Sequence, residues 1–565
     1  MPALRMNVFQ GEIPVKDARL LPDPNAVEAE NVRVDAGTLR GIGSPKLIRA
    51  LQPTTRRIYR IPGADISDWA SSTWMEFSDV NTDVVRSPIV NDAYDRYYWA
   101  SPSTGPLWSP KQRIIDGLAP YKLGLPGPTT APTLAGAGGS GTIVTRSYVV
   151  TFIDQYGHES QPSPPVEGAT YTNATWNVNN IPQPVADPSR APVTKIRIYR
   201  TTTATSGTTT FFKVGEVNVG VTTFADTTTD TVATGGGQIE SIMWAPPPAD
   251  LQGMIAMPNG ILVGWVGNDL YFSENYRPHA WPAEYVLTTE YPIVGLGVFG
   301  NTCVVCTSGH PAAVTGVKAS TMNFVTNTTA APCLSRRSIV STLNGVLYAS
   351  EAGLILFSQS GPMDASSHLV DRDQWVDVYT PAQLRAIHYG NNYTAVRTST
   401  GDDDGFYFNP VDQTGAGVVR LTDLGAAVDI DIDIWTGKPF LLANGNLYEW
   451  LAPNALPLEW RWRSKEMVLP KPLNLACYRV YFDDPLPGMV GPDEAPVTLK
   501  VWAWLVGENG ETTRKLVYDH PVMQANQVYR LPSGFKSDIW QVELMGKTRV
   551  RALHMATNPR ELVRV

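Results

Sequence analysis

The chain has 565 residues, including 47 glycines and 46 prolines, and 10% of its residues are aromatic and 17% charged. This composition is typical of a turn-rich β protein and excludes a largely disordered chain. No stretch approaches the roughly 18 consecutive apolar residues of a membrane span. Four cysteines are too few for a disulfide framework, and no secretory signal is visible, so we expect synthesis in a reducing cytoplasm.

The formal net charge of −8 is unevenly placed. Residues 241–458 hold 19 acidic and 9 basic side chains, whereas residues 459–565 hold 12 acidic and 15 basic ones. An acidic segment repels the phosphates of nucleic acid instead of binding them. We therefore expect residues 241–458 to avoid nucleic acid.

Residues 1–50 are polar and interrupted by prolines, and we interpret them as an N-terminal arm. Within it, Asn25–Val34 predicts one short helix or strand. The arm has too little apolar content to form a core by itself, so it must lie along the body or along a neighbouring subunit. Its candidate inter-subunit residues are Phe9, Ile13, Leu20, Leu21, Val27 and Val32.

Residues 51–126 are interpreted as the first part of a β-propeller. Strands are predicted at Arg57–Ile61, Thr73–Phe77, Val84–Arg86 and Arg96–Ala100, with the spacing of a propeller blade. A stretch rich in Pro, Gly and Ser follows at 125–141, which is typical of a linker.

Residues 127–239 are rich in threonine and lack the hairpin repeat found further along. Alternating segments at Ser147–Ser160, Lys195–Arg200 and Phe211–Val217 predict a small antiparallel sandwich. The segment looks like a fibronectin type III domain inserted into a blade loop, where insertions are tolerated.

Residues 240–458 are interpreted as the second part of the propeller, because a hairpin recurs in them. Copies lie at Asn259–Ser273, Asn344–Ser358 and Gly437–Trp450, and weaker ones begin at Gly300 and Gly390. Their starts are about 40 to 48 residues apart, the length of a four-stranded blade. Each copy reads as strand, glycine-containing turn, strand.

The repeat ends after Trp450, and residues 459–565 predict a separate C-terminal β-sandwich. Clean alternation at Trp460–Lys465, Cys477–Phe482 and Val497–Leu505 indicates strands with one buried face. The whole chain is thus predicted to be all-β.

Two motifs suggest chemistry, but their context favours structure. Gly295–Gly300 matches a dinucleotide-binding glycine pattern but leads into a strand, so no helix N-terminus would meet a pyrophosphate. Cys303 and Cys306 have zinc-ligand spacing, yet residues i and i+3 of a strand point to opposite faces. Buried thiols and a blade turn are therefore expected, and we predict no metal and no cofactor.

Two groups of aspartates are candidate sites. Asp402, Asp403 and Asp404 precede Gly405 but lack the further ligands of a calcium loop, which favours a solvated turn. Asp429, Asp431 and Asp433 share one face of a predicted strand, which is costly unless that face meets water or a cation. We expect an exposed or lumen-facing strand there. No catalytic residue is identified, and we expect no enzyme.

The chain resembles the tail nozzle proteins of short-tailed bacteriophages, often called tail accessory or DNA-stabilization proteins. The stretches that carry this resemblance are Phe9–Pro14, Leu20–Leu39, Asp269–Pro282, Arg530–Phe535, Trp540–Leu544 and Ala552–Leu562. None of them is a catalytic motif, and the inserted sandwich departs from a minimal nozzle.

The resemblance implies a virion protein, made in the bacterial cytoplasm, that forms a ring of six copies below the portal and adaptor. The ring would conduct double-stranded DNA during ejection and hold tail fibres or a tail needle. The six aspartates named above are the candidates to face its lumen or its mouth. Two alternatives stay open, namely a tail-tip or fibre-network protein of a long-tailed phage and a carbohydrate-binding propeller with Trp and Tyr as sugar platforms.

Overall fold

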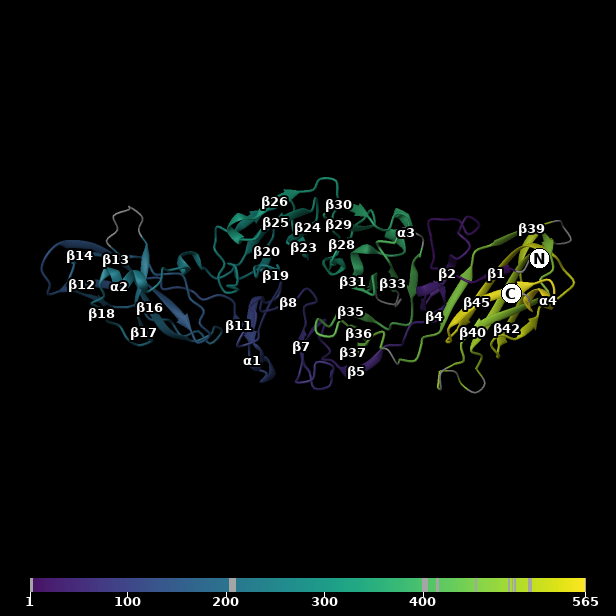
Figure 1. Ribbon diagram of the computed structural model, residues 1–565, viewed down its shortest axis with the longest axis horizontal. Helices are drawn as coiled ribbons and strands as arrows, with labels where there is room; N and C mark the ends of the chain where they lie inside the picture. Colours follow the sequence, from purple (N-terminus) through teal and green to yellow (C-terminus); the bar gives the residue numbers. More distant parts are fainter. Residues whose placement is uncertain are drawn as a thin grey trace. The chain divides into compact units, whose positions relative to one another are not determined.

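The architecture is that of a computed structural model, which describes residues 4–202, 210–398, 405–412, 416–452, 455–485, 488–489, 491, 494–506 and 511–563. Short antiparallel strands dominate these residues, as the composition predicted (Figure 1). The chain divides into two compact units, which we call unit 1 (Met1–Val80 with Thr328–Val565) and unit 2 (Asn81–Asn327).

Among the described residues, unit 1 contains three runs of four neighbouring antiparallel strands, which we call meanders, and one hairpin, and one of these runs is the end of a ten-stranded sheet. The first meander is β27 (Val340–Ser341), β28 (Gly345–Ala349), β29 (Leu354–Ser358) and β30 (Gly361–Asp364). The second is β31 (Leu384–Tyr389), β32 (Asn392–Arg397), β33 (Gly405–Phe408) and β34 (Val419–Leu421). The third joins β35 (Ala427–Ile432), β36 (Pro439–Ala443) and β37 (Asn446–Glu449) to β5 (Lys46–Ala50) from the arm, and the hairpin is β6 (Arg57–Ile61) with β7 (Thr73–Phe77).

The recurring phrase of the sequence forms hairpins, as predicted. Its copies at Asn344–Ser358 and Gly437–Trp450 supply β28–β29 and β36–β37, the second and third strands of their sheets. The turn of the latter copy has Asn444 and Gly445 at φ 51° and 71°, the left-handed pair that a tight hairpin turn requires. Local turn chemistry thus fixes the register of these pairs.

Neighbouring meanders of unit 1 share apolar cores. Val396 and Leu421 of the second meander pack in one cluster with Leu441 and Trp450 of the third. Trp74 of β7 lies edge-on to Phe440 of β36, with ring centroids 6.1 Å apart. Stacking of sheet faces therefore replaces helix packing as the source of the core.

Besides β5, the N-terminal arm contributes one strand to each of two further sheets of its own chain. Its strand β1 (Leu4–Met6) pairs with β45 (Val550–Ala556), next to β40 (Cys477–Phe482) and β43 (Val528–Arg530). Its strand β2 (Ala26–Glu30) lies between β34 and β38 (Trp460–Ser464) in a ten-stranded sheet. Beyond β38 that sheet continues through β44 (Ser537–Gly546), β41 (Val497–Val506) and β42 (Thr512–Val522), and β39 (Met467–Leu473) pairs with β44.

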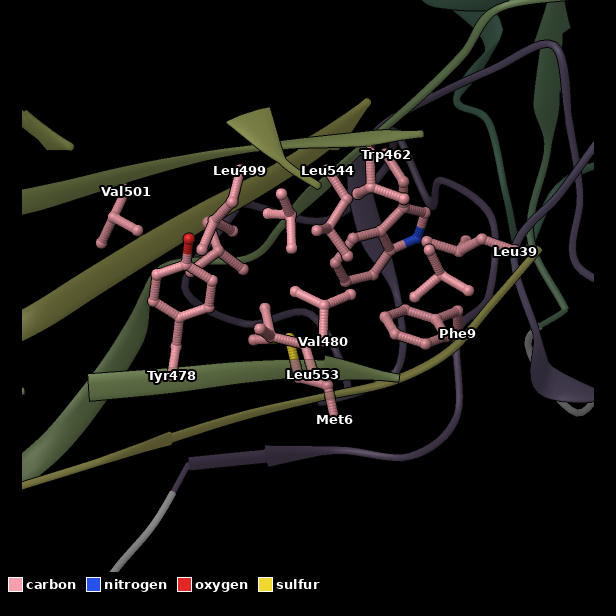
Figure 2. Close-up of a cluster of buried hydrophobic side chains, with 14 of the residues drawn as sticks. Met6, Phe9, Leu39, Trp462, Tyr478, Val480, Leu499, Val501, Leu544 and Leu553 are labelled. Atoms are coloured by element: carbon pink, nitrogen blue, oxygen red, sulfur yellow. The ribbon is translucent and has the colours of Figure 1, made fainter. Parts of the chain in front are cut away.

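These two sheets enclose the core that Figure 2 shows. Phe9 from the arm meets Trp462 of β38 edge-on at 4.9 Å, and the Trp462 indole N–H donates to the Gln10 carbonyl at 2.9 Å. Leu553 and Val480 face Leu499 and Leu544 across the same core. The arm is therefore part of this core and also joins it to the β31–β34 meander.

Unit 2 contains three more four-stranded meanders. They are β8 (Asp83–Arg86), β9 (Arg96–Ser101), β10 (Gly105–Pro110) and β11 (Tyr121–Lys122); β19 (Gln252–Ala256), β20 (Leu262–Val266), β21 (Asp269–Phe272) and β22 (Val286–Thr288); and β23 (Ile293–Phe299), β24 (Thr302–Thr307), β25 (Ala312–Thr315) and β26 (Asn323–Thr326). The copy of the phrase at Asn259–Ser273 forms β20–β21, as predicted.

The segment predicted as an insert also folds into strands. One sheet holds β12 (Thr133–Ala137), β15 (Thr175–Asn179) and β18 (Phe224–Asp226), and another holds β13 (Ile143–Asp154), β14 (Val166–Tyr171), β16 (Val193–Thr201) and β17 (Phe211–Asn218). Residues of both sheets, such as Trp176 and Ile196, form one cluster. Arg200 and Asp226 pair at 2.9 Å with fully buried side chains.

The insert is tied to the β8–β11 meander by a buried polar junction. Its loop residue His158 donates from Nδ1 to the Asp154 carboxylate at 2.9 Å and accepts at Nε2 from Arg96 of β9 at 2.6 Å. Tyr156 of the same loop lies edge-on to Trp108 of β10, at 5.1 Å. The insert thus contributes to the core of its neighbour instead of hanging from a flexible linker.

The helices of the described residues are short. They are α1 (Lys111–Ile115), α2 (Asp230–Gly235), α3 (Arg372–Asp377) and α4 (Pro559–Val563), with 3-10 turns η1 (Asp35–Gly37), η2 (Ser241–Met243), η3 (Ala319–Thr321), η4 (Arg336–Ser338) and η5 (Pro381–Gln383); a two-residue ladder joins β3 (Val32–Arg33) and β4 (Arg40–Gly41). Among the described residues, no helix is long and apolar enough to cross a membrane.

Candidate functional site

The aspartate row predicted to face a lumen is paired with arginines. Arg57 of β6 donates to Asp429 at 2.8 Å and also bridges Asp431 of β35. The Asp429 side chain is 1% exposed and that of Asp431 is 29% exposed. The cation that the strand pattern required is therefore a guanidinium of the same unit.

Asp433 is the most enclosed of the row. Its carboxylate accepts from Arg60 at 2.6 Å, and both side chains are 1% exposed. It also accepts from the amide and hydroxyl of Thr436, which closes the loop after β35. Arg60 in turn donates to Ser72 at 2.8 Å and lies over the Trp69 ring. A buried ion pair whose two side chains also make other hydrogen bonds has a structural role.

The prediction that Asp429 and Asp433 face a lumen is thus wrong, because both are buried and neutralised by arginines. Asp431 is partly exposed but shares Arg57 with Asp429. Asp402, Asp403 and Asp404 lie outside the described residues. The partners Arg57 and Arg60 come from a strand about 370 residues earlier in the chain, which a local pattern does not reveal.

Four of the six predicted inter-subunit residues of the arm are buried in their own chain. Phe9 and Val32 are 0% exposed, Leu21 3% and Ile13 4%. Val27 is partly buried against the cluster that holds Ile13. The sequence left two positions open for the arm, along the rest of its own chain or along a neighbouring subunit. These five side chains pack against their own chain, so they are unavailable to a neighbouring subunit. Leu20, 75% exposed, keeps that role as a prediction.

A network of charged side chains joins the arm to its neighbouring strands, and no local sequence pattern indicated it. Glu12 accepts from the Ala29 amide at 2.6 Å and from Arg420 at 2.9 Å. Arg420 also reaches Glu28 and Glu30, which pair further with Arg461 and Arg463 of β38. These contacts run along one face of the ten-stranded sheet, where acidic β2 lies between basic neighbours.

Glu12 is the member of this network with the clearest titration shift. Burial raises its pKa to about 7, and this outweighs Arg420 and the Ala29 amide, which lower it. A raised folded-state pKa means that the folded protein binds the proton more tightly than the unfolded chain. The stabilising contribution of this proton is fully present below about pH 4.5 and is lost as the pH rises to about 7.

Glu12→Gln is therefore expected to remove a pH-dependent loss of stability. The wild type should lose about 3 kcal/mol of its free energy of unfolding between pH 4.5 and 7 through this group, and the variant should not, since one pKa unit corresponds to about 1.4 kcal/mol. Urea unfolding across this pH range measures the difference. Glu351→Gln, at a side chain that is 63% exposed, is the control. A difference between Glu12→Gln and wild type that stays constant with pH would contradict the assignment.

The glycine motif and the cysteine pair lie in or beside strands, as predicted. Gly295 and Gly297 lie in β23, and Gly300 turns the chain into β24 with φ 51°. Cys303 and Cys306 are buried free thiols, and burial raises the pKa of Cys303 to about 12. Within the described parts of the chain, no group of three or more His, Cys, Asp or Glu side chains is placed to hold a metal ion.

A small pocket opens in unit 1 between the β3–β4 ladder and the meanders behind it. It has a volume of about 50 Å³, enough for roughly four water molecules. Its polar and aromatic lining residues are Arg33, Tyr389, Asn392, Thr394, Tyr407 and Trp450. The Tyr407 hydroxyl donates to the Val32 carbonyl at 2.7 Å, which fixes the arm against this wall. Sequence reasoning missed the pocket because these six residues come from five separate strands or turns.

No protein-family model matches the chain, and neither does any curated protein. Solved structures similar to it include the WD40 domain of Neurospora crassa Pan2, at TM-score 0.28 and 11% identity, covering 50% of this chain and 86% of that one. Apo AztD from Citrobacter koseri has TM-score 0.28 and 10% identity, covering 72% and 100%. YCF48 bound to D1 peptide has TM-score 0.25 and 12% identity, covering 55% and 92%. Similarity this low does not bear on what the chain binds.

Proposed function

We propose that the chain is a non-catalytic structural protein of a bacteriophage tail, in the position of the nozzle. In this role it forms a ring of copies below the portal and adaptor, conducts double-stranded DNA and holds tail fibres. The proposal begins from the resemblance to nozzle proteins in the arm, in Asp269–Pro282 and in the C-terminal segment.

One observation carries the proposal: the arm and the C-terminal segment, which share the resemblance, form one body. Strand β2 pairs with β38, and β1 pairs with β45 near the opposite end of the chain. Phe9 and Leu39 of the arm pack in the same core as Leu544 and Leu553 of the C-terminal segment (Figure 2). The stretches that carry the resemblance at the two ends of the chain therefore share one core.

The fold within this proposal is a propeller with two sandwiches. The four-stranded meanders are its blades. The insert, with sheets of three and four strands around one cluster, is the fibronectin type III-like sandwich, and the two sheets around the Phe9–Trp462 core are the C-terminal sandwich. A platform of this kind offers broad rigid surfaces for assembly.

Conduction of DNA needs a wall that does not hold phosphate. The excess of ten acidic side chains in residues 241–458 supports such a wall. Because Asp429, Asp431 and Asp433 are paired with arginines, the proposal depends on this excess as a whole and not on those three residues.

The experiment that tests the function combines oligomeric state with DNA binding. Mass photometry of the purified protein should give a species of six times the 61.7 kDa chain mass, and negative-stain images should show rings. A mobility-shift assay with linear duplex DNA at physiological salt should show no complex. Trimers would favour the tail-tip alternative, and monomers at all concentrations the carbohydrate-binding one. Tight duplex binding would overturn conduction.

A further inference from the structure

We propose that the junction between the insert and its neighbours in unit 2 is an acid-sensitive latch, which holds the insert while His279 is neutral and releases it when His279 takes up a proton. This inference goes beyond the tail role and does not depend on it. The junction consists of Arg96, Asp154, His158, Trp244 and His279, which come from the insert, from the two meanders beside it and from the segment that joins them.

Two buried histidines from different parts of unit 2 are stacked at this junction. His158 lies in the loop that follows β13 of the insert, and His279 lies in the loop between β21 and β22. Their ring centroids are 4.4 Å apart, with an angle of 26° between the planes. Trp244, which precedes β19, meets the His279 ring edge-on at 5.5 Å. Each histidine is only 5% exposed, so a charge on either ring would be cut off from water.

The hydrogen bonds of His158 require its neutral form. Arg96 of β9 donates to Nε2 at 2.6 Å, and Nδ1 donates to Asp154 at 2.9 Å. A guanidinium has donors only and keeps its proton in proteins, so Nε2 must accept in this contact. The carboxylate of Asp154 also accepts from the backbone amides of Tyr156 and His158. This carboxylate is therefore occupied by its own loop, while Arg96 places a full positive charge beside the stacked rings.

His279 lacks a counter-charge. Neither of its ring nitrogens has a hydrogen-bond partner among the described residues. The charged or titratable side chains that act on it are Arg96 from β9, His158 from the insert and Arg277 from its own loop, and each of them disfavours a positive charge on the ring. The backbone of Glu159 favours that charge but makes no hydrogen bond to the ring. A proton on His279 would therefore lie unpaired among positive groups.

The direction of the pH effect follows from these contacts. Burial, and to a lesser degree the neighbours just named, lower the pKa of His279 well below its ordinary value of 6.5. Glu240, which lies 3.7 Å from Arg277, does not offset this, because its side chain is 71% exposed and screened by water. The opened junction, in which His279 meets water, thus binds the proton more tightly than the closed one. The closed form is fully favoured above about pH 6.5 and is lost as the pH falls below that value.

Opening of the junction is expected to leave the parts on either side of it folded. The two sheets of the insert enclose a core of their own, which includes Trp176 and Ile196. The β19–β22 meander shares a separate core with β23–β26, in which Trp265 and Val305 are buried. Acid should therefore release the insert as a folded body before it unfolds unit 2.

The test is hydrogen exchange of the full-length protein between about pH 7.5 and 5, followed by mass spectrometry and expressed as protection relative to the unstructured chain. Peptides that cover 155–160 and 275–281 report on the junction, through the amides of His158 and Ala280, which donate to Asp154 and to the Arg277 carbonyl at 2.9 Å each. We expect their protection to fall by about tenfold or more, since each pH unit below 6.5 favours the opened junction by about tenfold. Peptides from β16 and β24 should keep their protection.

The wild-type protein alone can overturn the proposal. Unchanged protection of the two junction peptides down to about pH 5 would show that no proton opens the contact. A parallel loss of protection in β16 or β24 would show that acid unfolds the unit as a whole, and that no separate latch exists.

His279→Phe assigns the effect to this residue. A phenyl ring can keep the stack on His158 and the contact with Trp244 but cannot take up a proton, so the acid-induced loss of protection should disappear. His279→Gln, which also stays neutral, replaces this variant if His279→Phe does not fold. His520→Gln removes an exposed histidine of β42 in unit 1, and as the matched control it should respond as the wild type does. An acid response that persists without His279, or that disappears equally without His520, contradicts the assignment.

Discussion

A chain that begins at residue 46 is expected to be insoluble or to lose its cooperative unfolding transition. Removing residues 1–45 takes β2 out of the middle of the ten-stranded sheet and leaves β34 and β38 with open edges, which favours aggregation. It also removes Phe9, Val32 and Leu39 from the core around Trp462. The soluble yield and the thermal unfolding curve of the truncated chain measure this effect.

Two single substitutions distinguish the buried side chains of the arm, which stabilise the core, from its exposed ones, which do not. Phe9→Ala deletes a ring that is 0% exposed and should lower the free energy of unfolding by about 3–5 kcal/mol. Leu20→Ala alters a side chain that is 75% exposed and should change it by less than about 0.5 kcal/mol. A truncated chain that melts as the full-length protein does would show that β2 is dispensable.

Sequence patterns predicted the parts of this fold whose cause is local. The hairpins at Asn344–Ser358 and Gly437–Trp450 depend on adjacent alternating strands and on a turn such as Asn444–Gly445, all within about fifteen residues. The place of β2 depends on Trp460–Ser464, more than 400 residues away. The sequence of the arm alone therefore indicated no core for it. In the folded chain, the C-terminal segment supplies the apolar side chains against which the arm packs.

The predictions about the candidate sites were wrong or incomplete because the partners of these residues are also distant in the sequence. The row Asp429, Asp431 and Asp433 correctly indicated a need for cations, but Arg57 and Arg60 are separated from it by about 370 residues. Glu12 gave no signal at all, because its burial and its partner Arg420 follow from tertiary packing. Chemistry that depends on single residues brought together from distant strands is visible only in the folded chain.

Asp433→Lys is expected to prevent folding of unit 1. It is not expected to add a DNA-binding cation to a channel wall, because Asp433 is buried. The substitution places an ammonium group beside the Arg60 guanidinium, where both native side chains are 1% exposed. Breaking a buried pair costs about 3–5 kcal/mol, and the repulsion between two buried cations adds to this cost. The soluble yield and the thermal melting of the variant measure the outcome.

The matched control for this substitution is Glu351→Lys. The Glu351 side chain is 63% exposed in its pair with Arg372, so the same carboxylate-to-lysine change should cost less than about 1 kcal/mol. If Asp433→Lys melts within a few degrees of Glu351→Lys, the Arg60–Asp433 pair is not the buried tie described above. If Asp433→Lys fails to fold, slow DNA release by particles carrying it reports loss of the subunit. Tests of conduction therefore need exposed acidic residues of 241–458, because only there does a change of charge leave the fold intact.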